Sequence, residues 1–361
     1  MYKRQVTEYL QEDAMSTLTS FQRVMTAIEL KEPDRVPVVP MITYTTAQLI
    51  GIQFSEALYS AEKMARALVA GYKAAGYDGI YVGWESSFNL MAEAMGCKLE
   101  IQPNHIAFVK DQLIKEQGDL DKIKVADPEK DGRLPLHLKA ISLVKEKIGE
   151  DVPIFKYVPG PLTLTSILRG QSQFLMDLAR KPEFIYDILK PATESSKRFA
   201  VATVEQGADI VVVADPIASS TVISPKTFDQ FALSPIKEVL KAISDVGGIP
   251  SLHICGKTSP ILGRMVDAGA RIIELDYLVD LAFAKDEVGK KVCIEGNVDP
   301  VGVLLNGKPD DVKREVKECI KKAAKGGGFI LSSGCEVPLN APFENIKAMV
   351  SAVKKYGQYP I

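Results

Sequence analysis

Short apolar runs recur along this chain, and stretches with helical periodicity separate most of them. The clearest run, residues 209–216, is almost continuously aliphatic, which is typical of a strand buried on both faces of a parallel sheet. Runs of this kind predict strands at residues 35–40, 79–84, 153–158, 209–216, 249–255, 271–276, 292–297 and 329–332.

Apolar positions at steps of three and four predict the helices between these strands. Ser60 and Gly76 have the residue types that begin and end a helix, and they bound the segment between them. Pro191 predicts a break in the longest helical stretch. The predicted helices cover residues 21–30 (capped by Ser20), 60–75, 136–148, 173–179, 182–206, 225–241, a short segment ending at 268, 310–325 and 343–356.

Alternation of strands and helices in one chain of this size predicts a (β/α)₈ TIM barrel. We expect residues 1–361 to form a single domain, in which residues 1–20 are a small N-terminal helical extension. Residues 97–110 contain two short β-like segments, which we interpret as a β insertion after the second strand. A doubly wound sheet is the alternative architecture.

Composition and charge narrow the class of partner. The chain has 361 residues and a net charge of −2, without a block of like charge, which argues against nucleic acid and anionic membranes as partners. No apolar run approaches the roughly 20 residues of a membrane span. Five cysteines at irregular spacing and a polar N-terminus favour a reducing compartment, and we expect the cytoplasm.

The ends of two predicted strands carry candidate metal ligands. His253 and Cys255 lie two residues apart in a strand, so their side chains point to the same side. Cys335 follows another strand, and catalytic residues of such barrels lie at the C-terminal ends of strands. Zinc prefers imidazole nitrogen and thiolate sulfur, and three protein ligands with a vacant fourth position define a catalytic zinc site. The sequence therefore predicts an open zinc site formed by His253, Cys255 and Cys335.

A purely structural interpretation competes with this hypothesis, because an unpaired cysteine commonly behaves as a small buried hydrophobe. On that interpretation Cys255 and Cys335 are packing residues and His253 is a hydrogen-bonded core imidazole. The remaining cysteines and histidines lie away from strand ends, and we assign them packing, structural or surface roles. They are Cys97, Cys293, Cys319, His105 and His137.

Other polar residues at strand ends are candidates for catalysis by position. Asp215 can be a fourth metal ligand, a partner that orients His253, or the first residue of a loop before a proline. Asn297 lies in a segment with turn chemistry, which either faces a substrate or forms a plain turn. Glu85 and Glu274 are candidates only because each follows or ends an apolar run.

Several segments together resemble the uroporphyrinogen decarboxylase superfamily. The resemblance extends over nearly the whole chain, and it implies a (β/α)₈ barrel. Within the superfamily, the His-x-Cys pair and the late Gly334-Cys335 are similar to the branch of zinc-dependent methylcobamide:coenzyme M methyltransferases and related corrinoid methyltransferases. The segments that carry the resemblance are residues 34–38, 207–209, 224–228, 252–256, 296–300, 327–331 and 342–346.

The resemblance implies an activity and a set of partners. By similarity, His253, Cys255 and Cys335 correspond to the zinc ligands of a methyltransferase. The methyl group would move between a corrinoid carried by a partner protein and a small substrate, either a thiol such as coenzyme M or a methoxylated compound. Tetrapyrrole decarboxylation is the first alternative, but residues 41–47 lack the arginines that pair with substrate carboxylates in the decarboxylases. A non-catalytic docking barrel with a structural metal is the second.

Overall fold

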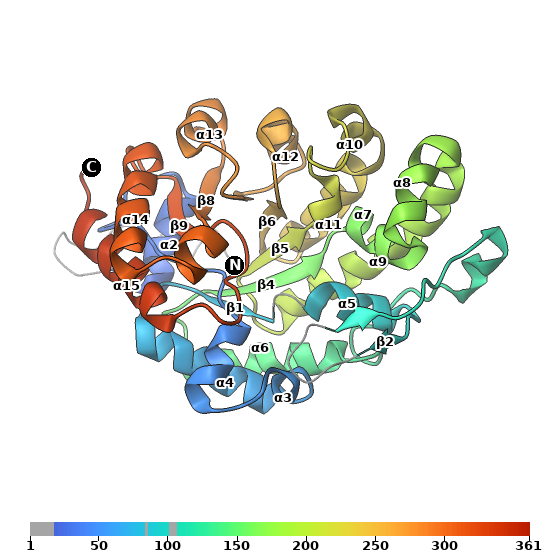
Figure 1. The fold of residues 1–361 in the computed structure, drawn as a ribbon, viewed down its shortest axis with the longest axis horizontal. Coiled ribbons are helices and arrows are strands. Elements are labelled where there is room, and N and C mark those ends of the chain that lie inside the picture. The colour runs from blue at the N-terminus through green and yellow to red at the C-terminus, as the bar shows by residue number, and fades with distance from the viewer. Residues whose placement is uncertain (1–17, 84–85, 101–106) are drawn as a thin grey trace.

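A curved parallel sheet forms the centre of the computed structural model, which describes residues 18–83, 86–100 and 107–361 (Figure 1). Its seven strands follow one another in chain order, and each pairs in parallel with the next. They are β1 (Ile80–Val82), β4 (Ile154–Pro159), β5 (Ile210–Ala214), β6 (Ile249–Ile254), β7 (Ile272–Leu275), β8 (Cys293–Val298) and β9 (Phe329–Ser333). The sheet order never reverses, so the doubly wound alternative is wrong.

The segment predicted as the first strand closes the sheet without becoming a regular strand. Val38 forms a parallel bridge with Leu331 of β9, and the Val39 amide donates to the Leu331 carbonyl over 2.8 Å. On the other side, the Asp78 amide donates to the Val38 carbonyl over 2.7 Å, just before β1. Pro37 and Pro40 have no N–H to donate, which limits pairing to these isolated bonds. The predicted TIM barrel is confirmed as a TIM-barrel-like fold with a short first strand.

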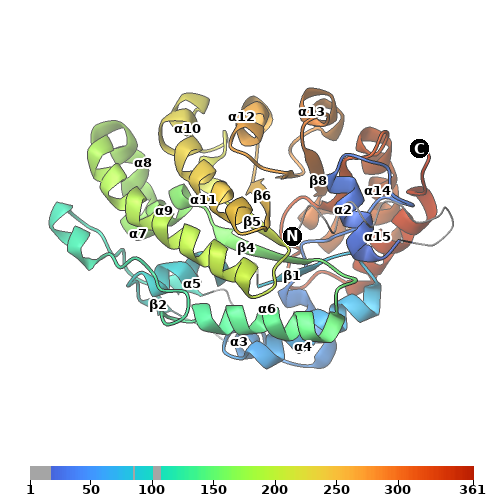
Figure 2. The ribbon, with the colours of Figure 1, turned by 180° about the vertical axis from the view of Figure 1, so that it is seen from behind.

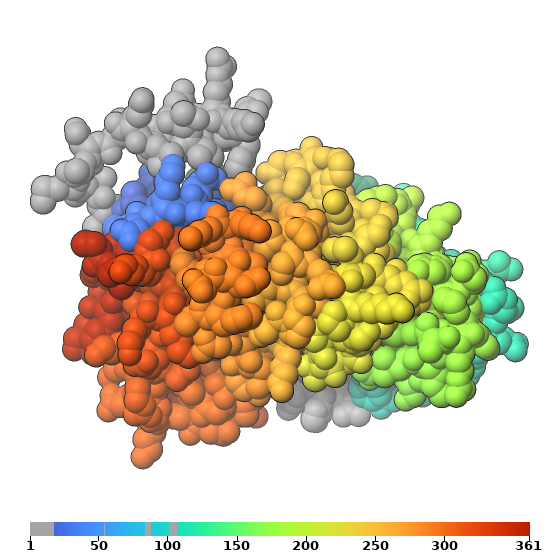
Figure 3. All heavy atoms as spheres, turned by 90° about the horizontal axis from the view of Figure 1, so that it is seen from above, coloured from blue at the N-terminus to red at the C-terminus, as the bar shows by residue number. Residues whose placement is uncertain are grey.

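Helices surround the strands in both ribbon views (Figures 1 and 2). Seen as spheres, the chain runs around the molecule in order, and the last segments lie against residues near the start (Figure 3). The helices are α2 (Ser20–Ile28), α3 (Phe54–Leu58), α4 (Ala61–Ala75), α5 (Ser86–Ala94), α6 (Leu134–Ile148), α7 (Pro161–Arg169), α8 (Gln171–Arg180), α9 (Pro182–Glu205), α10 (Pro225–Phe231), α11 (Leu233–Asp245), α12 (Leu262–Asp267), α13 (Leu281–Val288), α14 (Pro309–Ala323) and α15 (Phe343–Tyr356).

The structure corrects several helix predictions. Thr19, not Ser20, caps α2, because its side chain accepts a hydrogen bond from the Gln22 amide. The predicted break at Pro191 is wrong: α9 continues through it, since its buried face packs against the sheet and neighbouring helices. The single helix predicted over residues 225–241 is two helices, α10 and α11, and α7 and α13 were not predicted.

The predicted β insertion is present among the described residues. Strands β2 (Leu99–Glu100) and β3 (Phe108–Val109) pair antiparallel after α5. The rest of the predicted hairpin, including His105, falls in residues 101–106, outside the described residues. The predicted N-terminal extension likewise lies almost entirely outside them.

Side chains on alternate strand positions form two separate cores. One core fills the space between the strands and the surrounding helices, and it includes Leu252 and Ile254 of β6. The other lies inside the barrel, and it includes Ile249 of β6 together with Val24 and Ile28 of α2. Helix α2 therefore packs against the barrel interior at the end opposite the strand C-termini. None of the helices in the described part of the chain is long and apolar enough to cross a membrane.

Candidate metal centre

Three predicted metal ligands meet at the C-terminal ends of β6 and β9. The imidazole Nε2 of His253 lies 3.0 Å from Cys255 Sγ, and Cys255 Sγ lies 3.6 Å from Cys335 Sγ. Their possible ligand atoms all lie within 4.8 Å of one another. His253 is fully buried, while both cysteines are partly exposed. The structure thus brings the three residues together as the sequence predicts, and the cluster can hold a metal ion.

The spacing of these atoms fits a tetrahedral zinc site. With Zn–S near 2.3 Å and Zn–N near 2.0–2.1 Å, tetrahedral geometry separates two sulfurs by about 3.8 Å and nitrogen from sulfur by about 3.5 Å. The sulfur–sulfur distance of 3.6 Å is close to this value, and it is far longer than a disulfide bond. The nitrogen–sulfur distance of 3.0 Å is shorter, so ion binding would move His253 and Cys255 slightly apart.

The electrostatics of the cluster also favour a cation. Hydrogen bonding to Cys255 and burial raise the pKa of Cys335 well above its ordinary value. Burial acts to lower the pKa of His253, but Cys335 and the carboxylates of Glu274 and Asp276 raise it overall. Because the raised pKa of Cys335 disfavours its thiolate, a nearby positive charge would help this thiol to ionise and bind as a ligand.

A layer of buried polar groups lies beneath the cluster, inside the barrel. Glu274 Oε2 is 3.6 Å from His253 Nδ1 and accepts a 2.5 Å hydrogen bond from the Tyr157 hydroxyl. The other oxygen of Glu274 accepts hydrogen bonds from Ser251 at 3.0 Å and Tyr81 at 3.2 Å. Burial raises the pKa of Glu274, and these three hydrogen bonds hold its carboxyl group in place. Glu274 is therefore held in contact with the far side of the His253 ring.

Sequence reasoning missed most of this layer. Tyr81 also donates to Glu295 over 2.6 Å, and burial together with Glu274 raises the pKa of Glu295 well above its ordinary value. Tyr81 and Tyr157 stack with their ring centroids 4.9 Å apart. The side chain of each of these residues points from a strand into the barrel. Because side chains alternate between the two faces of a strand, counting every second residue along each strand could have identified them.

Asp215 has a different position from the three ligands. Its carboxylate accepts hydrogen bonds from the amides of Leu162 and Thr163, at 3.1 and 2.8 Å, and from the Thr163 hydroxyl at 2.6 Å. These amides belong to the first turn of α7, where unpaired N–H groups favour a carboxylate. Burial raises the pKa of Asp215 to about 6. Asp215 thus anchors α7 and is not among the clustered ligand atoms.

Asn297 and Asp276 hold the loops beside the cluster. The Asn297 amide donates to the carbonyls of Asp276 at 2.9 Å and Val279 at 2.7 Å, which fixes the loop after β7. Asp276 accepts from the amides of Gly256 at 2.8 Å and Leu278 at 2.9 Å. The loops after β6 and β7 are therefore joined directly behind Cys255. Glu85, the remaining predicted site residue, lies outside the described residues.

The other cysteines and His137 lie away from this cluster. Cys97, Cys293 and Cys319 are buried. His137 is buried between α6 and β4, where its Nδ1 lies 3.2 Å from the Nζ of Lys156. Burial lowers the pKa of Lys156 to about 7, and its ammonium donates to the Gly83 carbonyl over 2.9 Å. The sequence analysis did not identify Lys156.

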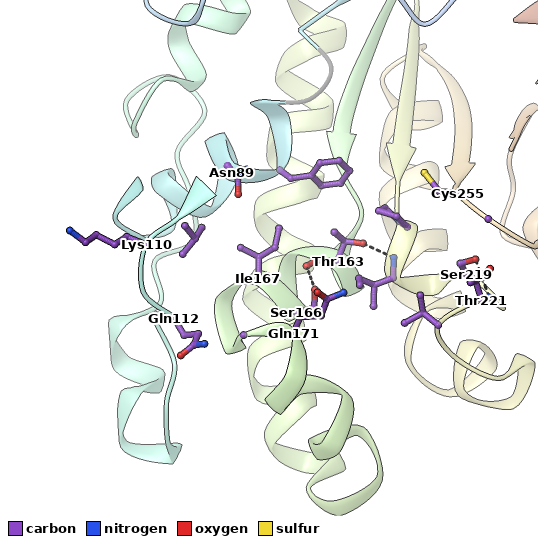
Figure 4. Close-up of a pocket in the computed structure, with 17 residues that line it drawn as sticks. Asn89, Lys110, Gln112, Thr163, Ser166, Ile167, Gln171, Ser219, Thr221 and Cys255 are labelled. Carbon is purple, nitrogen blue, oxygen red and sulfur yellow. Dashed lines mark hydrogen bonds between the residues drawn. The ribbon is translucent and has the colours of Figure 1, made fainter. Parts of the chain in front are cut away.

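A cavity of about 670 Å³ opens beside Cys255 (Figure 4). The end of β6 forms one side of it, and α5, α7 and the β2–β3 insertion form the other. Its described lining residues are Phe88, Asn89, Val109, Lys110, Gln112, Thr163, Ser166, Ile167, Gly170, Gln171, Pro216, Ile217, Ser219, Thr221, Val222, Cys255 and Gly256. One candidate ligand therefore lines a space large enough for a small organic molecule.

Fold and site together define a TIM-barrel-like protein with a candidate His-Cys-Cys metal centre at the C-terminal ends of its strands. The chain belongs to the uroporphyrinogen decarboxylase (URO-D) family, whose sequence profile matches residues 19–356. This match confirms the superfamily resemblance that the sequence motifs carry.

The more similar relatives include methyltransferases of Methanosarcina species. The chain is 34% identical to the methylcobamide:CoM methyltransferase MtaA of Methanosarcina barkeri, over 95% of this chain and 99% of the relative. It is 32% identical to the methylcobamide:CoM methyltransferase MtbA of Methanosarcina acetivorans, with the same coverage. The solved structure of a methyltransferase from Methanosarcina mazei superposes with a TM-score of 0.85 and 30% identity, over 94% of this chain and 99% of that one.

Proposed function

We propose that this protein is a zinc-dependent methyltransferase that moves a methyl group between a corrinoid bound to a partner protein and a small substrate. The observation that carries the proposal is the meeting of His253, Cys255 and Cys335 at the strand ends, where both cysteines are partly exposed and Cys255 lines a cavity. The similarity to two methylcobamide:CoM methyltransferases over nearly their full lengths supports the same activity.

The donor set suits zinc, and the substrate is a thiol such as coenzyme M or a methoxylated compound. His253, Cys255 and Cys335 would hold the zinc ion, whose positive charge would lower the pKa of a substrate thiol or polarise an ether oxygen. Glu274 orients the His253 ring and offsets part of that charge from behind. The cavity beside Cys255 holds the substrate.

The other predicted catalytic residues have supporting roles in this proposal. Asp215 anchors the first turn of α7, which forms part of the cavity wall. Asn297 fixes the loop after β7, and through Asp276 that loop is joined to the residue after Cys255. Both are positioning residues: Asp215 holds part of the cavity wall in place, and Asn297 holds the loop beside the cluster in place. Glu85 stays a prediction from the sequence.

A corrinoid carried by a separate protein must reach the open side of the cluster. The C-terminal ends of the strands form that side, so the partner would dock over the barrel mouth. The rival interpretation as a tetrapyrrole decarboxylase needs cations for the substrate carboxylates, and residues 41–47 supply none.

Metal analysis and a colour assay on the same protein samples test the proposal. Wild type is expected to bind one zinc ion per chain and to bleach the methyl–cobalt absorption of methylcobalamin when a thiol is added. The His253→Ala variant should lose both zinc and bleaching while it keeps its circular dichroism spectrum. Stoichiometric zinc without bleaching, even with a methylated donor and reduced corrinoid, would indicate a structural metal in a docking barrel.

A further inference from the structure

We infer that the small substrate is a largely uncharged molecule about the size of a substituted aromatic ring, bound in the cavity beside Cys255. The inference rests on the proposed function, because it takes the exposed side of Cys255 as the place of reaction. The cavity measures about 670 Å³, within the range of roughly 300–1,000 Å³ that encloses a whole drug-sized ligand. A two-carbon thiol would occupy only a small part of it.

The charge of the cavity wall argues against an anionic substrate. Among the described lining residues, Lys110 is the one charged side chain. In Figure 4 its chain extends away from the other labelled residues, towards the outside of the insertion. An anionic group that extends from the metal site into this cavity would lose its water and meet no cationic side chain among the described lining residues other than Lys110, which is costly. A sulfonated thiol is therefore poorly matched to this space.

Hydroxyl groups at the Cys255 end can donate to a neutral ligand. Thr221 Oγ1 accepts from the Lys257 amide at 3.0 Å, and Ser219 Oγ accepts from the Thr221 amide at 3.2 Å. Because both oxygens act as acceptors in these bonds, each retains its proton for an acceptor on the substrate. A Cβ on Gly256 would lie 2.6 Å from Thr221 Oγ1 and 2.8 Å from Ser219 Oγ, so both hydroxyls flank the residue after Cys255.

The rest of the cavity wall provides apolar surface and neutral amides. Phe88, Ile217 and Val222 line the cavity together with Ile167, a half-buried residue of α7. In Figure 4, Ile167 lies between the Asn89 and Lys110 side of the cavity and Thr163. A ring with a hydrogen-bonding substituent buries its apolar faces here and keeps its polar group satisfied. Ile167 is thus a specificity-determining residue, because its size sets the room for that ring.

Two chemical classes of substrate with such a ring are compatible with methyl transfer, a thiol and a methoxyarene. If it is a thiol, its sulfur bonds to the methyl carbon, the carbon–cobalt bond breaks with its electron pair left on cobalt, and the thiol proton passes to solvent. If it is a methoxyarene, its oxygen–methyl bond breaks, the methyl group goes to the reduced corrinoid of the partner, and the phenolate oxygen takes a proton. The shared chemistry is an uncharged ring next to the reacting atom.

The test compares three thiols as methyl acceptors from methylcobalamin with zinc-loaded protein. Benzyl mercaptan is large and neutral, 2-mercaptoethanol is small and neutral, and 2-mercaptoethanesulfonate is small and anionic. We expect kcat/KM for benzyl mercaptan to exceed that for 2-mercaptoethanesulfonate at least about tenfold, since burial of a ring contributes far more than one tenfold step. The Ile167→Trp variant should reduce this ratio about tenfold. The matched control is Ile148→Trp, a half-buried isoleucine at the end of α6 remote from the cavity, and it should keep the ratio.

Isothermal titration with benzyl mercaptan and with 2-methoxyphenol measures binding independently of transfer. Binding in wild type and in Ile148→Trp, with loss in Ile167→Trp, supports the inference, and the methoxyphenol arm distinguishes an ether substrate from a thiol. Equal or better use of 2-mercaptoethanesulfonate by wild type would overturn it, as would an unchanged ratio in folded Ile167→Trp. If no thiol bleaches methylcobalamin, the thiol version of the proposed function fails, while absence of binding by both ring compounds overturns the cavity assignment separately.

Discussion

Two buried polar clusters lie at opposite ends of the barrel. They differ in how far the charges of their own residues balance one another. At the end that α2 covers, Asp78 accepts hydrogen bonds from Arg23 at 2.8 Å, from Arg35 at 2.7 and 2.9 Å, and from the Val38 amide at 2.9 Å. Arg23 also pairs with Asp34 at 2.7 Å. We call Arg23, Asp34, Arg35 and Asp78 the arginine–aspartate cluster.

The metal-site cluster of His253, Cys255 and Cys335 has no comparable charge balance. In the arginine–aspartate cluster, Arg23 lowers the pKa of Asp34 even though burial acts to raise it, so opposite charges stabilise one another. In the metal-site cluster, hydrogen bonding and burial raise the pKa of Cys335, and the nearest ionisable neighbours include carboxyl groups. The comparison teaches that one cluster balances its charges with its own residues beside the first predicted strand, whereas the other could hold an added cation.

The largest expected effect is the loss of activity when one sulfur ligand is removed. Cys335→Ala should bind less than one tenth of the zinc of wild type and lose methyl transfer by on the order of a thousandfold, because zinc contributes several kcal/mol to such a reaction. Its melting temperature should stay close to that of wild type. Zinc analysis and the methylcobalamin assay measure both quantities. Cys319→Ala, a buried cysteine of α14, is the matched control and should keep full zinc.

The opposite pattern is expected at the other end of the barrel. Asp78→Ala leaves Arg23 and Arg35 buried with less negative charge, and breaking a buried ion pair in this way costs about 3–5 kcal/mol. Denaturant unfolding should show this loss, whereas zinc per folded chain stays at the wild-type value. Asp310→Ala, in a single exposed pair with Lys313, should change stability by less than about 1 kcal/mol. A normal midpoint for Asp78→Ala would show that the cluster is not a structural anchor.

Lys156 sharpens the comparison, because it is a fully buried amine that donates to the Gly83 carbonyl and lies 3.2 Å from His137 Nδ1. Burial lowers the pKa of Lys156 from 10.5 to about 7, so the unfolded chain binds more protons between these values. Stability should therefore rise with pH in this window and be lowest at pH 7 and below. Relative to Lys156→Met, wild type should gain about 3 kcal/mol between pH 7 and 9.5. Parallel pH profiles of the two proteins would contradict this.

The smallest effect is expected behind the metal-site cluster. Glu274→Gln keeps the shape of the side chain but removes its charge from the neighbourhood of His253 Nδ1, and such a loss typically weakens zinc binding about 10–100-fold. Competition with a zinc chelator measures the affinity. Ser251→Ala removes one hydrogen bond to Glu274 and should weaken binding less than Glu274→Gln does. An unchanged affinity in Glu274→Gln would mean that the carboxylate only fills the barrel interior.

The metal-site cluster could be predicted because it depends on simple rules. His253 and Cys255 share a side of one strand through the period of two, and Cys335 follows another strand whose end lies at the same face of the barrel. The strands themselves were predictable from their continuous apolar runs. Several are a few residues shorter than predicted, and the first forms only isolated bridges, where Pro37 and Pro40 limit its pairing.

The layer beneath the cluster and the cavity could not be predicted in the same way. Tyr81 and Glu274 point into the barrel at the same level along its axis, where they share a hydrogen bond. The level of each inward residue depends on the stagger between strands that are far apart in sequence. Helix α7 was missed because Leu162 and Leu164 alternate with Thr163 and Thr165, a pattern that favours a strand. Without α7, the role of Asp215 at its first turn had no visible basis.

X-ray absorption at the zinc edge of the purified protein, with and without a bound thiol, tests the open metal site most directly. We predict one zinc per chain with two sulfurs near 2.3 Å and one nitrogen near 2.0–2.1 Å from protein ligands, and a third sulfur when thiol is added. A protein that binds no zinc, or a zinc shell that the thiol leaves unchanged, would contradict the account.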